Sequence, residues 1–129
     1  MNQMSFHNNE PIKAPPHRNL PISQHLIKAY KAWQEYLANF PKTTKYTLGA
    51  KIDDVFVLTI ELIFIAGSLP KEQKTPYLQK AISKIDLLKF FLQLAWEIKS
   101  LDNKKYIVLS EQLNNIGKML WGWNKQLIK

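Results

Sequence analysis

The chain has 129 residues, no cysteine and a formal net charge of +8. This length predicts one domain with one core, and the lack of cysteine excludes disulfides, thiolate metal sites and cysteine nucleophiles while fitting a reducing compartment. Arg18 is the only arginine, so the positive charge is almost all lysine, a hydrated point charge rather than a planar fork. We therefore expect binding of nucleic acid or another acidic partner, largely without sequence selection.

Residues 1–21 contain four prolines and no apolar periodicity, which predicts a flexible tail. The tail lacks the apolar segment of a signal peptide. The longest apolar run, 55–66, is interrupted by Thr59 and Glu61 and is shorter than the ~20 residues that cross a bilayer. We expect a cytoplasmic protein with no membrane partner, folded over residues 22–129.

Two helices are predicted between Pro21 and Ala66, where apolar residues recur every three or four positions. The first opens at Pro21 and closes at 39–41. The second begins at Thr43 or Thr44, which offer N-caps, and runs to about Ala66 before a stop that contains Gly and Pro. The apolar faces of these two helices are Leu26, Tyr30, Trp33 and Leu37, then Leu48, Ile52, Phe56, Ile60 and Ile63.

A third and a fourth helix are predicted in the second half of the chain. Thr75-Pro76 places Pro at the first helical position of the third, which runs to about Lys99, and 101–103 form a turn. Short connections favour antiparallel neighbours, so we predict an all-α, up-down-up-down four-helix bundle. The apolar face of the fourth helix is Leu109, Leu113, Ile116, Leu120, Trp123 and Leu127.

The segment Ile82–Leu101 is apolar on two opposite sides, at about 100° per residue. One side suits the core of a bundle, and the other requires a second cover. That cover is most simply another subunit; the alternative is a central helix buried within one subunit. The first side consists of Ile85, Leu88, Leu92 and Trp96, and the second of Leu87, Phe90, Phe91, Leu94, Ile98 and Leu101. We expect self-association, with a subunit interface formed by Leu87, Phe91, Leu94 and Ile98.

No set of residues indicates catalysis, a cofactor or a metal site. His7, His17 and His25 have no partner at ligand spacing, and no glycine-rich phosphate loop is present. Asp53-Asp54 resembles a metal-binding pair only superficially, because helical neighbours point about 100° apart. We expect one of these carboxylates to be exposed and the other to lie at an interface, and we expect no enzymatic activity.

The last helix contains two glycines and two tryptophans within 116–123. Glycine costs about 1 kcal/mol in a helix interior, so Gly117 and Gly122 predict close packing against a neighbouring backbone. Trp123 fits the core face. Trp121 has two interpretations: an anchor in an interface, or an aromatic surface beside Lys118 on which bases stack.

Several segments taken together resemble the Avd-like four-helix-bundle proteins. This family includes the accessory variability protein of diversity-generating retroelements and is related to proteins encoded in intervening sequences of large-subunit ribosomal RNA genes. The resemblance covers about 22–126 and is strongest in the last two helices. Its segments are Phe40-Pro41-Lys42, Tyr46-Thr47-Leu48-Gly49, 63–66, 85–94 and 116–123.

The resemblance implies a homopentameric barrel of four-helix bundles with a basic surface. It also implies a non-catalytic accessory subunit that binds a reverse transcriptase and nucleic acid and supports mutagenic copying of a template RNA. A pentamer would cover the second apolar side of the third helix. The alternative is a family member without a retroelement, acting as a structural or RNA-binding bundle.

The family's third-helix motif commonly has two basic residues four positions apart, on one face. Lys89 matches the first, whereas Gln93 stands at the second. The candidate residues for binding nucleic acid and the reverse transcriptase are Lys80, Lys84, Lys89 and Lys118.

Overall fold

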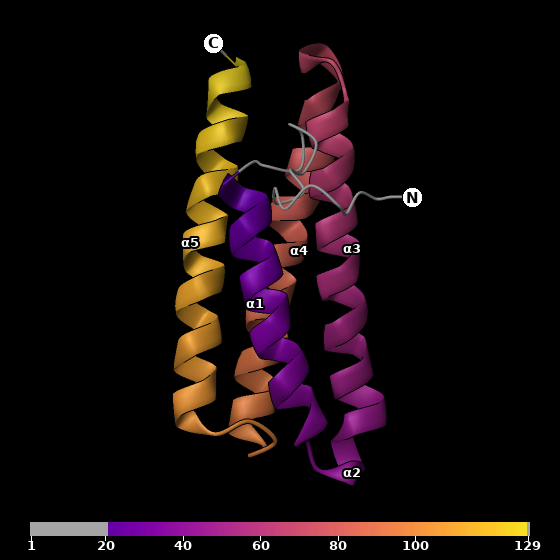
Figure 1. Ribbon diagram of the computed structural model, residues 1–129, viewed down its shortest axis with the longest axis vertical. Coiled ribbons are helices and arrows are strands. Elements are labelled where there is room, and N and C mark those ends of the chain that lie inside the picture. Colours follow the sequence, from indigo (N-terminus) through magenta and orange to yellow (C-terminus); the bar gives the residue numbers. More distant parts are fainter. Residues whose placement is uncertain (1–20, 129) are drawn as a thin grey trace, which may run out of the picture.

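The structure is a computed structural model that describes residues 21–128, with Ile128 described by its backbone alone. Throughout this part the chain is helical and contains no strand. The predicted tail, together with His7 and His17, lies outside the described residues except for Pro21, where the first helix begins. Four long helices, shown in Figure 1, are α1 (Pro21–Ala38), α3 (Ala50–Ser68), α4 (Lys71–Glu97) and α5 (Asn103–Ile128).

The four helices form an antiparallel bundle in which the chain reverses direction at each connection (Figure 1). α1 and α4 each pack against both α3 and α5. The predicted up-down-up-down four-helix bundle is thereby confirmed for the single chain. α1 is 18 residues long against 27 for α4 and 26 for α5, and it begins beside Met119 and Trp123, so the ends of α3, α4 and α5 extend past it. None of the helices in this part of the chain has the length and apolar content needed to cross a membrane.

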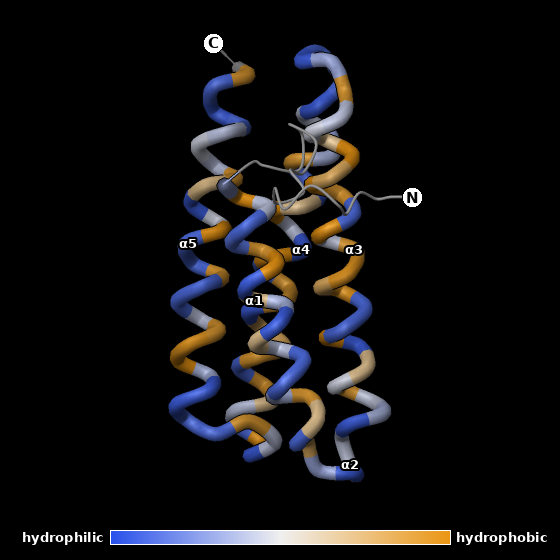
Figure 2. The backbone as a smooth tube through the Cα atoms, viewed as in Figure 1, coloured by the Kyte–Doolittle hydropathy of each residue, from blue (hydrophilic) through white to orange (hydrophobic). Residues whose placement is uncertain are grey.

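Apolar side chains from all four helices meet in one core, and Figure 2 shows hydrophobic residues recurring along each helix. Trp33 is fully buried, with its ring centroid 5.4 Å from that of Phe40 and 6.1 Å from that of Phe56. Trp123 is half-buried against this core. Trp96, predicted on the core side of the third helix, is instead 38% exposed. It lies one residue before the end of α4, and Tyr106 covers one face of its ring.

The connection from α1 to α3 contains a short helix, α2 (Lys42–Thr44), and a π-helical turn, η2 (Lys45–Gly49). The N-cap of α2 is Pro41, so the predicted cap at Thr43 is wrong. Thr44 is the N-cap of η2, although its side chain makes no capping hydrogen bond. Gly49 is buried, and a Cβ atom there would lie 2.8 Å from Leu37 Cδ1. The absence of a side chain at Gly49 lets the wide turn pass close to the end of α1.

α4 begins at Lys71 with Pro70 as its N-cap, which corrects the predicted start at Thr75-Pro76. Pro76 lies inside the helix, where its missing N–H removes one backbone hydrogen bond. Lys74 Nζ donates a hydrogen bond of 2.6 Å to the carbonyl oxygen of Ala66 near the end of α3. The additional first turn of α4 therefore joins the ends of two helices.

α4 ends at Glu97, and Lys99 has a φ of 67°, in the left-handed region. The N–H groups of Ser100 and Leu101 both donate to the carbonyl oxygen of Ala95, at 2.8 and 3.2 Å. This turn carries Leu101 back into the core, where it is 2% exposed. The predicted place of Leu101 on the second apolar side of the helix is therefore wrong, because the helix has already ended.

Asp53 links α1 to α3. Its Oδ1 atom accepts hydrogen bonds from Tyr30 Oη at 2.8 Å, Trp33 Nε1 at 3.1 Å and Gln34 Nε2 at 2.9 Å. Burial, followed by the hydrogen bond and the negative charge of Asp53, raises the pKa of the Tyr30 phenol. Asp54 is exposed, so the prediction of one exposed carboxylate and one at an interface is confirmed, with the interface lying between two helices of one chain.

Candidate nucleic-acid interface

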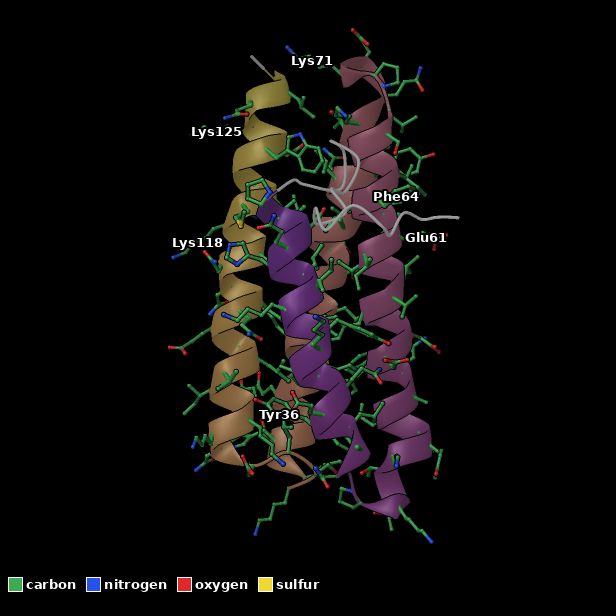
Figure 3. All side chains as sticks on the ribbon, viewed as in Figure 1. Tyr36, Glu61, Phe64, Lys71, Lys118 and Lys125 are labelled. Atoms are coloured by element: carbon green, nitrogen blue, oxygen red, sulfur yellow. The ribbon has the colours of Figure 1, made fainter. Side chains whose placement is uncertain are left out.

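A groove of about 230 Å³ between α4 and α5 brings Lys89 and Lys118 together. We call this groove and its continuation, described below, the α4–α5 groove. Figure 3 shows Lys118 and Lys125 extending from α5 away from the bundle. The residues that line the hollow are Ile82, Ile85, Asp86 and Lys89 of α4, and Asn114, Gly117, Lys118 and Trp121 of α5.

Gly117 forms part of the wall of this groove and is buried. A Cβ atom at Gly117 would lie 3.6 Å from Lys89 Nζ and 3.7 Å from Ile85 Cγ2. The Lys89 ammonium therefore lies against the surface of α5 at the point where α5 has no side chain. The prediction of close packing against a neighbouring backbone is wrong at Gly117, because both neighbouring atoms belong to side chains and lie at ordinary van der Waals distance.

Gly122 does not behave as predicted. It is exposed, and a Cβ atom there would meet no atom within 4 Å. Among residues 21–128 the prediction of close packing at this glycine is wrong, because the hollow that Gly122 lines with Pro21 and Ile22 of α1 leaves open space at this position.

The α4–α5 groove continues into a second hollow of about 340 Å³ that shares Asp86, Lys89 and Asn114 with the first. The side chains that line only this second hollow are Phe90, Gln93, Tyr106 and Ser110. Phe90 is 60% exposed here, as Trp121 is 61% exposed in the first hollow. Each hollow thus has one strongly exposed aromatic ring.

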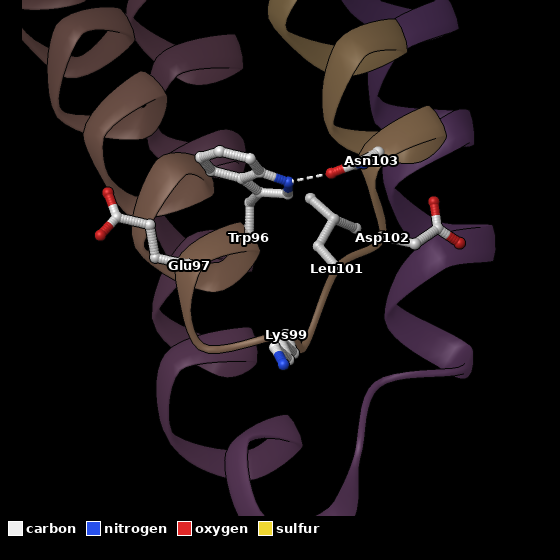
Figure 4. Close-up of a pocket in the computed structure, with 6 residues that line it drawn as sticks. All are labelled: Trp96, Glu97, Lys99, Leu101, Asp102 and Asn103. Carbon is white, nitrogen blue, oxygen red and sulfur yellow. Dashed lines mark hydrogen bonds between the residues drawn. The ribbon is translucent and has the colours of Figure 1, made fainter.

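Trp96 and Tyr106 close the groove near the turn between α4 and α5. Their ring centroids are 5.0 Å apart and the rings are nearly parallel, at 10°. Trp96 Nε1 donates a hydrogen bond to Asn103 Oδ1 (Figure 4). The hollow in Figure 4 is lined by two carboxylates, Glu97 and Asp102, and by one cation, Lys99, so it suits a polyanion less well than the groove beside it.

Gln93 occupies the position at which the family motif commonly has a second basic residue. Its Nε2 atom donates a hydrogen bond of 2.9 Å to Glu97 Oε2. The positive charge at this part of the groove therefore comes from Lys89, and Gln93 contributes an amide that lines the second hollow.

Lys80 and Lys84 lie on the other flank of α4. Lys80 precedes Lys89 by nine residues in one helix, which places the two about 180° apart around the axis. Lys80 Nζ lies 6.0 Å from the centre of the Tyr77 ring, and Lys84 is half-buried. The four candidate lysines thus form two pairs, Lys89 with Lys118 and Lys80 with Lys84.

The predicted interface residues continue the row of Lys80 and Lys84 along α4 at steps of three and four. Leu87 and Phe91 are half-buried against the core. Leu94 is 38% exposed and Ile98, just beyond the helix end, is 48% exposed. We call Leu87, Phe91, Leu94 and Ile98 the α4 apolar row. The described part of one chain covers this row incompletely, and its place in a subunit interface remains a prediction.

Sequence reasoning did not identify Asp86, Phe90, Ser110 and Asn114 as groove residues. One signal for them is present in α5, where Ser110, Asn114, Lys118 and Trp121 follow at steps of four, four and three. Such spacing places them along one side of a helix. The corresponding side of α4 could not be assigned without knowing which neighbour it packs against.

Among residues 21–128, no group of three or more His, Cys, Asp or Glu side chains is placed to hold a metal ion. The groups that line the α4–α5 groove are ammonium groups, amides, the hydroxyls of Ser110 and Tyr106, one carboxylate and exposed aromatic rings.

Comparison with known proteins gives one match. No curated protein and no solved structure matches the chain. A family model described as bAvd-like matches residues 21–127, from the first residue of α1 to the last turn of α5. The match includes both lysine pairs, the α4–α5 groove and the α4 apolar row, and it agrees with the resemblance found in the sequence. The chain belongs to the bAvd-like family.

Proposed function

We propose that this protein is a non-catalytic accessory subunit of a diversity-generating retroelement, binding the reverse transcriptase and the template RNA. Membership of the bAvd-like family over residues 21–127 carries the proposal, because it implies an accessory protein of the Avd type. The structure adds a groove that contains Lys89 and Lys118. In this role the protein needs no reactive group, since it acts by holding its partners together.

The two flanks of α4 suit different partners. The α4–α5 groove presents Lys89 and Lys118 beside polar side chains, which suits the phosphates of RNA. The other flank combines Lys80 and Lys84 with the α4 apolar row, and exposed apolar surface with a polar rim is typical of protein interfaces. We propose that the groove binds RNA and that the apolar row binds another subunit, with Lys80 and Lys84 at its edge for the reverse transcriptase.

A homopentamer, which the family resemblance implies, would repeat each lysine pair five times. Single contacts between lysine and phosphate are weak, but linked contacts add through a high effective concentration. Such binding would be largely independent of RNA sequence and would weaken steeply with salt. The formal charge of +8 on each chain supports this arrangement.

A second candidate function is an RNA-binding bundle that acts without a retroelement. Gln93 favours it, because the chain lacks the second basic residue of the family motif at that position. The two functions differ in one respect that can be measured: only the accessory subunit binds a reverse transcriptase.

The test is a binding series with template RNA, with unrelated RNA and with the reverse transcriptase of the same genome, at several salt concentrations. Three double variants carry the same change in charge: K89E/K118E in the groove, K80E/K84E on the other flank, and K28E/K31E at exposed positions of α1 as a control. We expect K89E/K118E to weaken RNA binding most, K80E/K84E to weaken binding of the enzyme, and the control to change both least.

Each outcome of this series has a defined meaning. If the wild type binds neither RNA nor the enzyme at low salt, the proposed function is wrong. If it binds RNA alone, the second candidate function replaces it. If all three double variants weaken RNA binding equally, only net charge matters and the assignment to the groove is wrong.

A further inference from the structure

Trp121 is the most exposed of the four tryptophans, at 61%. It follows Lys118 by three residues on α5, so the two side chains are neighbours on one face. An indole ring left in water at a functional surface marks a place where another flat or apolar group is covered on binding. The question is whether that group belongs to a protein or to a nucleotide.

The polar lining of the groove around Trp121 favours a nucleotide. Asp86, Lys89, Asn114 and Lys118 line the same hollow, and burying such groups against an apolar protein surface would cost free energy unless each found a partner. The α4 apolar row, the surface best suited to a second copy of the chain, lies on the other flank of α4. A nucleotide instead supplies a partner for each kind of group in the hollow.

The placement of the charges suggests how a nucleotide would lie. Phosphates pair with the ammonium groups of Lys89 and Lys118 and are repelled by the carboxylate of Asp86. Asp86 and Asn114 are shared by both hollows, and carboxylates and amides accept hydrogen bonds from the N–H groups of base edges. The lining therefore suits base edges near Asp86 and Asn114, with the sugar–phosphate chain along the lysines.

From these observations we infer that the α4–α5 groove binds unpaired nucleotides, with one base stacked on Trp121 and the next on Phe90. Within a duplex the base pairs stack on one another and leave no free base face for such a ring, whereas single strands stack their bases on exposed aromatic side chains. The two hollows share Asp86, Lys89 and Asn114, so successive nucleotides can follow one another along the groove. This inference rests on the proposed function and specifies the form of RNA that is bound.

The test compares a labelled single-stranded oligouridine with an RNA duplex of the same length, by fluorescence anisotropy over a range of salt. We expect W121A to weaken binding of the single strand by about tenfold and to leave duplex binding unchanged. W121F should retain most of the affinity, and F90A should add a further loss. Y46A is the matched control, because Tyr46 is 73% exposed on η2, outside the groove.

The salt dependence separates stacking from charge. Removal of an aromatic ring should leave the slope of log affinity against log salt unchanged, whereas K118Q should reduce it by about one. Indole fluorescence should be quenched by the single strand in the wild type and much less in W121A. Circular dichroism and sedimentation of each variant test whether the fold and the mass are retained.

Three results would overturn the inference. The first is single-strand binding by W121A equal to that of the wild type. The second is an equal loss for single strand and duplex. The third is a change in the sedimenting mass of W121A, which would make Trp121 an interface anchor. In each case, binding of the oligonucleotide by the wild type leaves the proposed function standing. A wild type that binds neither the single strand nor the duplex overturns that function itself.

Discussion

The side chain of Asp53 shows how one residue joins two helices that lie far apart in sequence. A single carboxylate oxygen accepts hydrogen bonds from Tyr30, Trp33 and Gln34. Trp33 is fully buried, and its indole N–H would lose its partner if the carboxylate were removed, at a cost of about 1–3 kcal/mol. The helix register predicted that only one of the two aspartates is exposed, but not which one, and the three donors on α1 could be identified only once α1 was placed beside α3.

The raised pKa of Tyr30 makes the stability of the bundle depend on pH in the alkaline range. Below the usual tyrosine pKa of 10.0, the phenol is protonated in both the folded and the unfolded chain. Above it, the unfolded chain loses the proton while the folded chain still holds it, so the free energy of unfolding falls as pH rises toward the folded-state pKa. Burial and the negative charges of Glu35 and Asp102 also raise the pKa of the Tyr36 phenol. Tyr36 therefore contributes to the pH dependence in the same direction.

We expect Tyr30→Phe to be less stable than the wild type at neutral pH, because it lacks the hydrogen bond to Asp53. Its loss of stability above pH 10 should be smaller. Urea unfolding at a series of pH values measures both effects, and Tyr46→Phe, at an exposed position, serves as the control. Parallel pH curves for wild type and Tyr30→Phe would contradict this account.

At the scale of single helices, α5 contains a glycine that no contact in the described part of the chain requires. Gly122 is exposed, and a Cβ atom there would meet nothing within 4 Å. Glycine inside a helix costs about 1 kcal/mol relative to alanine, and no packing among residues 21–128 offsets this cost. At Gly117 a Cβ atom would lie 3.6 Å from Lys89 Nζ, an ordinary van der Waals distance.

We expect Gly122→Ala to raise the free energy of unfolding by about 1 kcal/mol, because only the helix propensity changes. Gly49→Val is the opposite case and should lower it by about 1–3 kcal/mol, since even a Cβ atom there would lie 2.8 Å from Leu37 Cδ1. Thermal or urea unfolding of the two variants measures both changes. A loss of stability in Gly122→Ala would indicate that a neighbour approaches this glycine in the assembled protein.

The existence and the faces of the four long helices were predictable from the sequence, whereas several of their ends were not. Apolar spacing depends on residues close in sequence, and it placed Leu113, Ile116 and Leu120 in the core as found. The start of α4 depends on the contact between Lys74 and the end of α3. The end of α4 depends on the left-handed turn at Lys99. The apolar residues around that turn gave no sign that the helix ends there.

At the scale of the whole molecule, the two lysine pairs and the α4 apolar row divide the surface of α4. Sequence reasoning selected Lys89 by its match to the family motif and added Lys80, Lys84 and Lys118 as further candidates. It could not assign these lysines to two pairs, because the pairing depends on where α5 and α3 lie. Lys89 meets Lys118 because α5 packs on that side of α4, and Lys80 lies about 180° from Lys89 because nine residues make two and a half turns.

We expect Leu94→Glu to break the assembly, because the exposed Leu94 lies in the α4 apolar row and a charge buried there would be unpaired. Phe91→Glu should do the same, although Phe91 also contacts the core and its loss lowers stability. Sedimentation velocity measures the mass, with Ile107→Glu, at an exposed apolar position of α5, as the control. A wild-type monomer at micromolar concentration, or an unchanged mass for Leu94→Glu, would refute the proposed interface.

The short α1 gives the bundle two ends with different resistance to local opening. At one end all four helices pack together. At the other end, among residues 21–128, the end of α5 and the α3–α4 turn extend past the start of α1 at Pro21 and lack a fourth neighbour. Segments with fewer packed neighbours open with a lower free energy than the rest of a fold. Backbone amides near Ser68, Lys71 and Lys125 should therefore exchange with solvent through small local fluctuations, while those near Trp33 exchange only when the whole bundle unfolds.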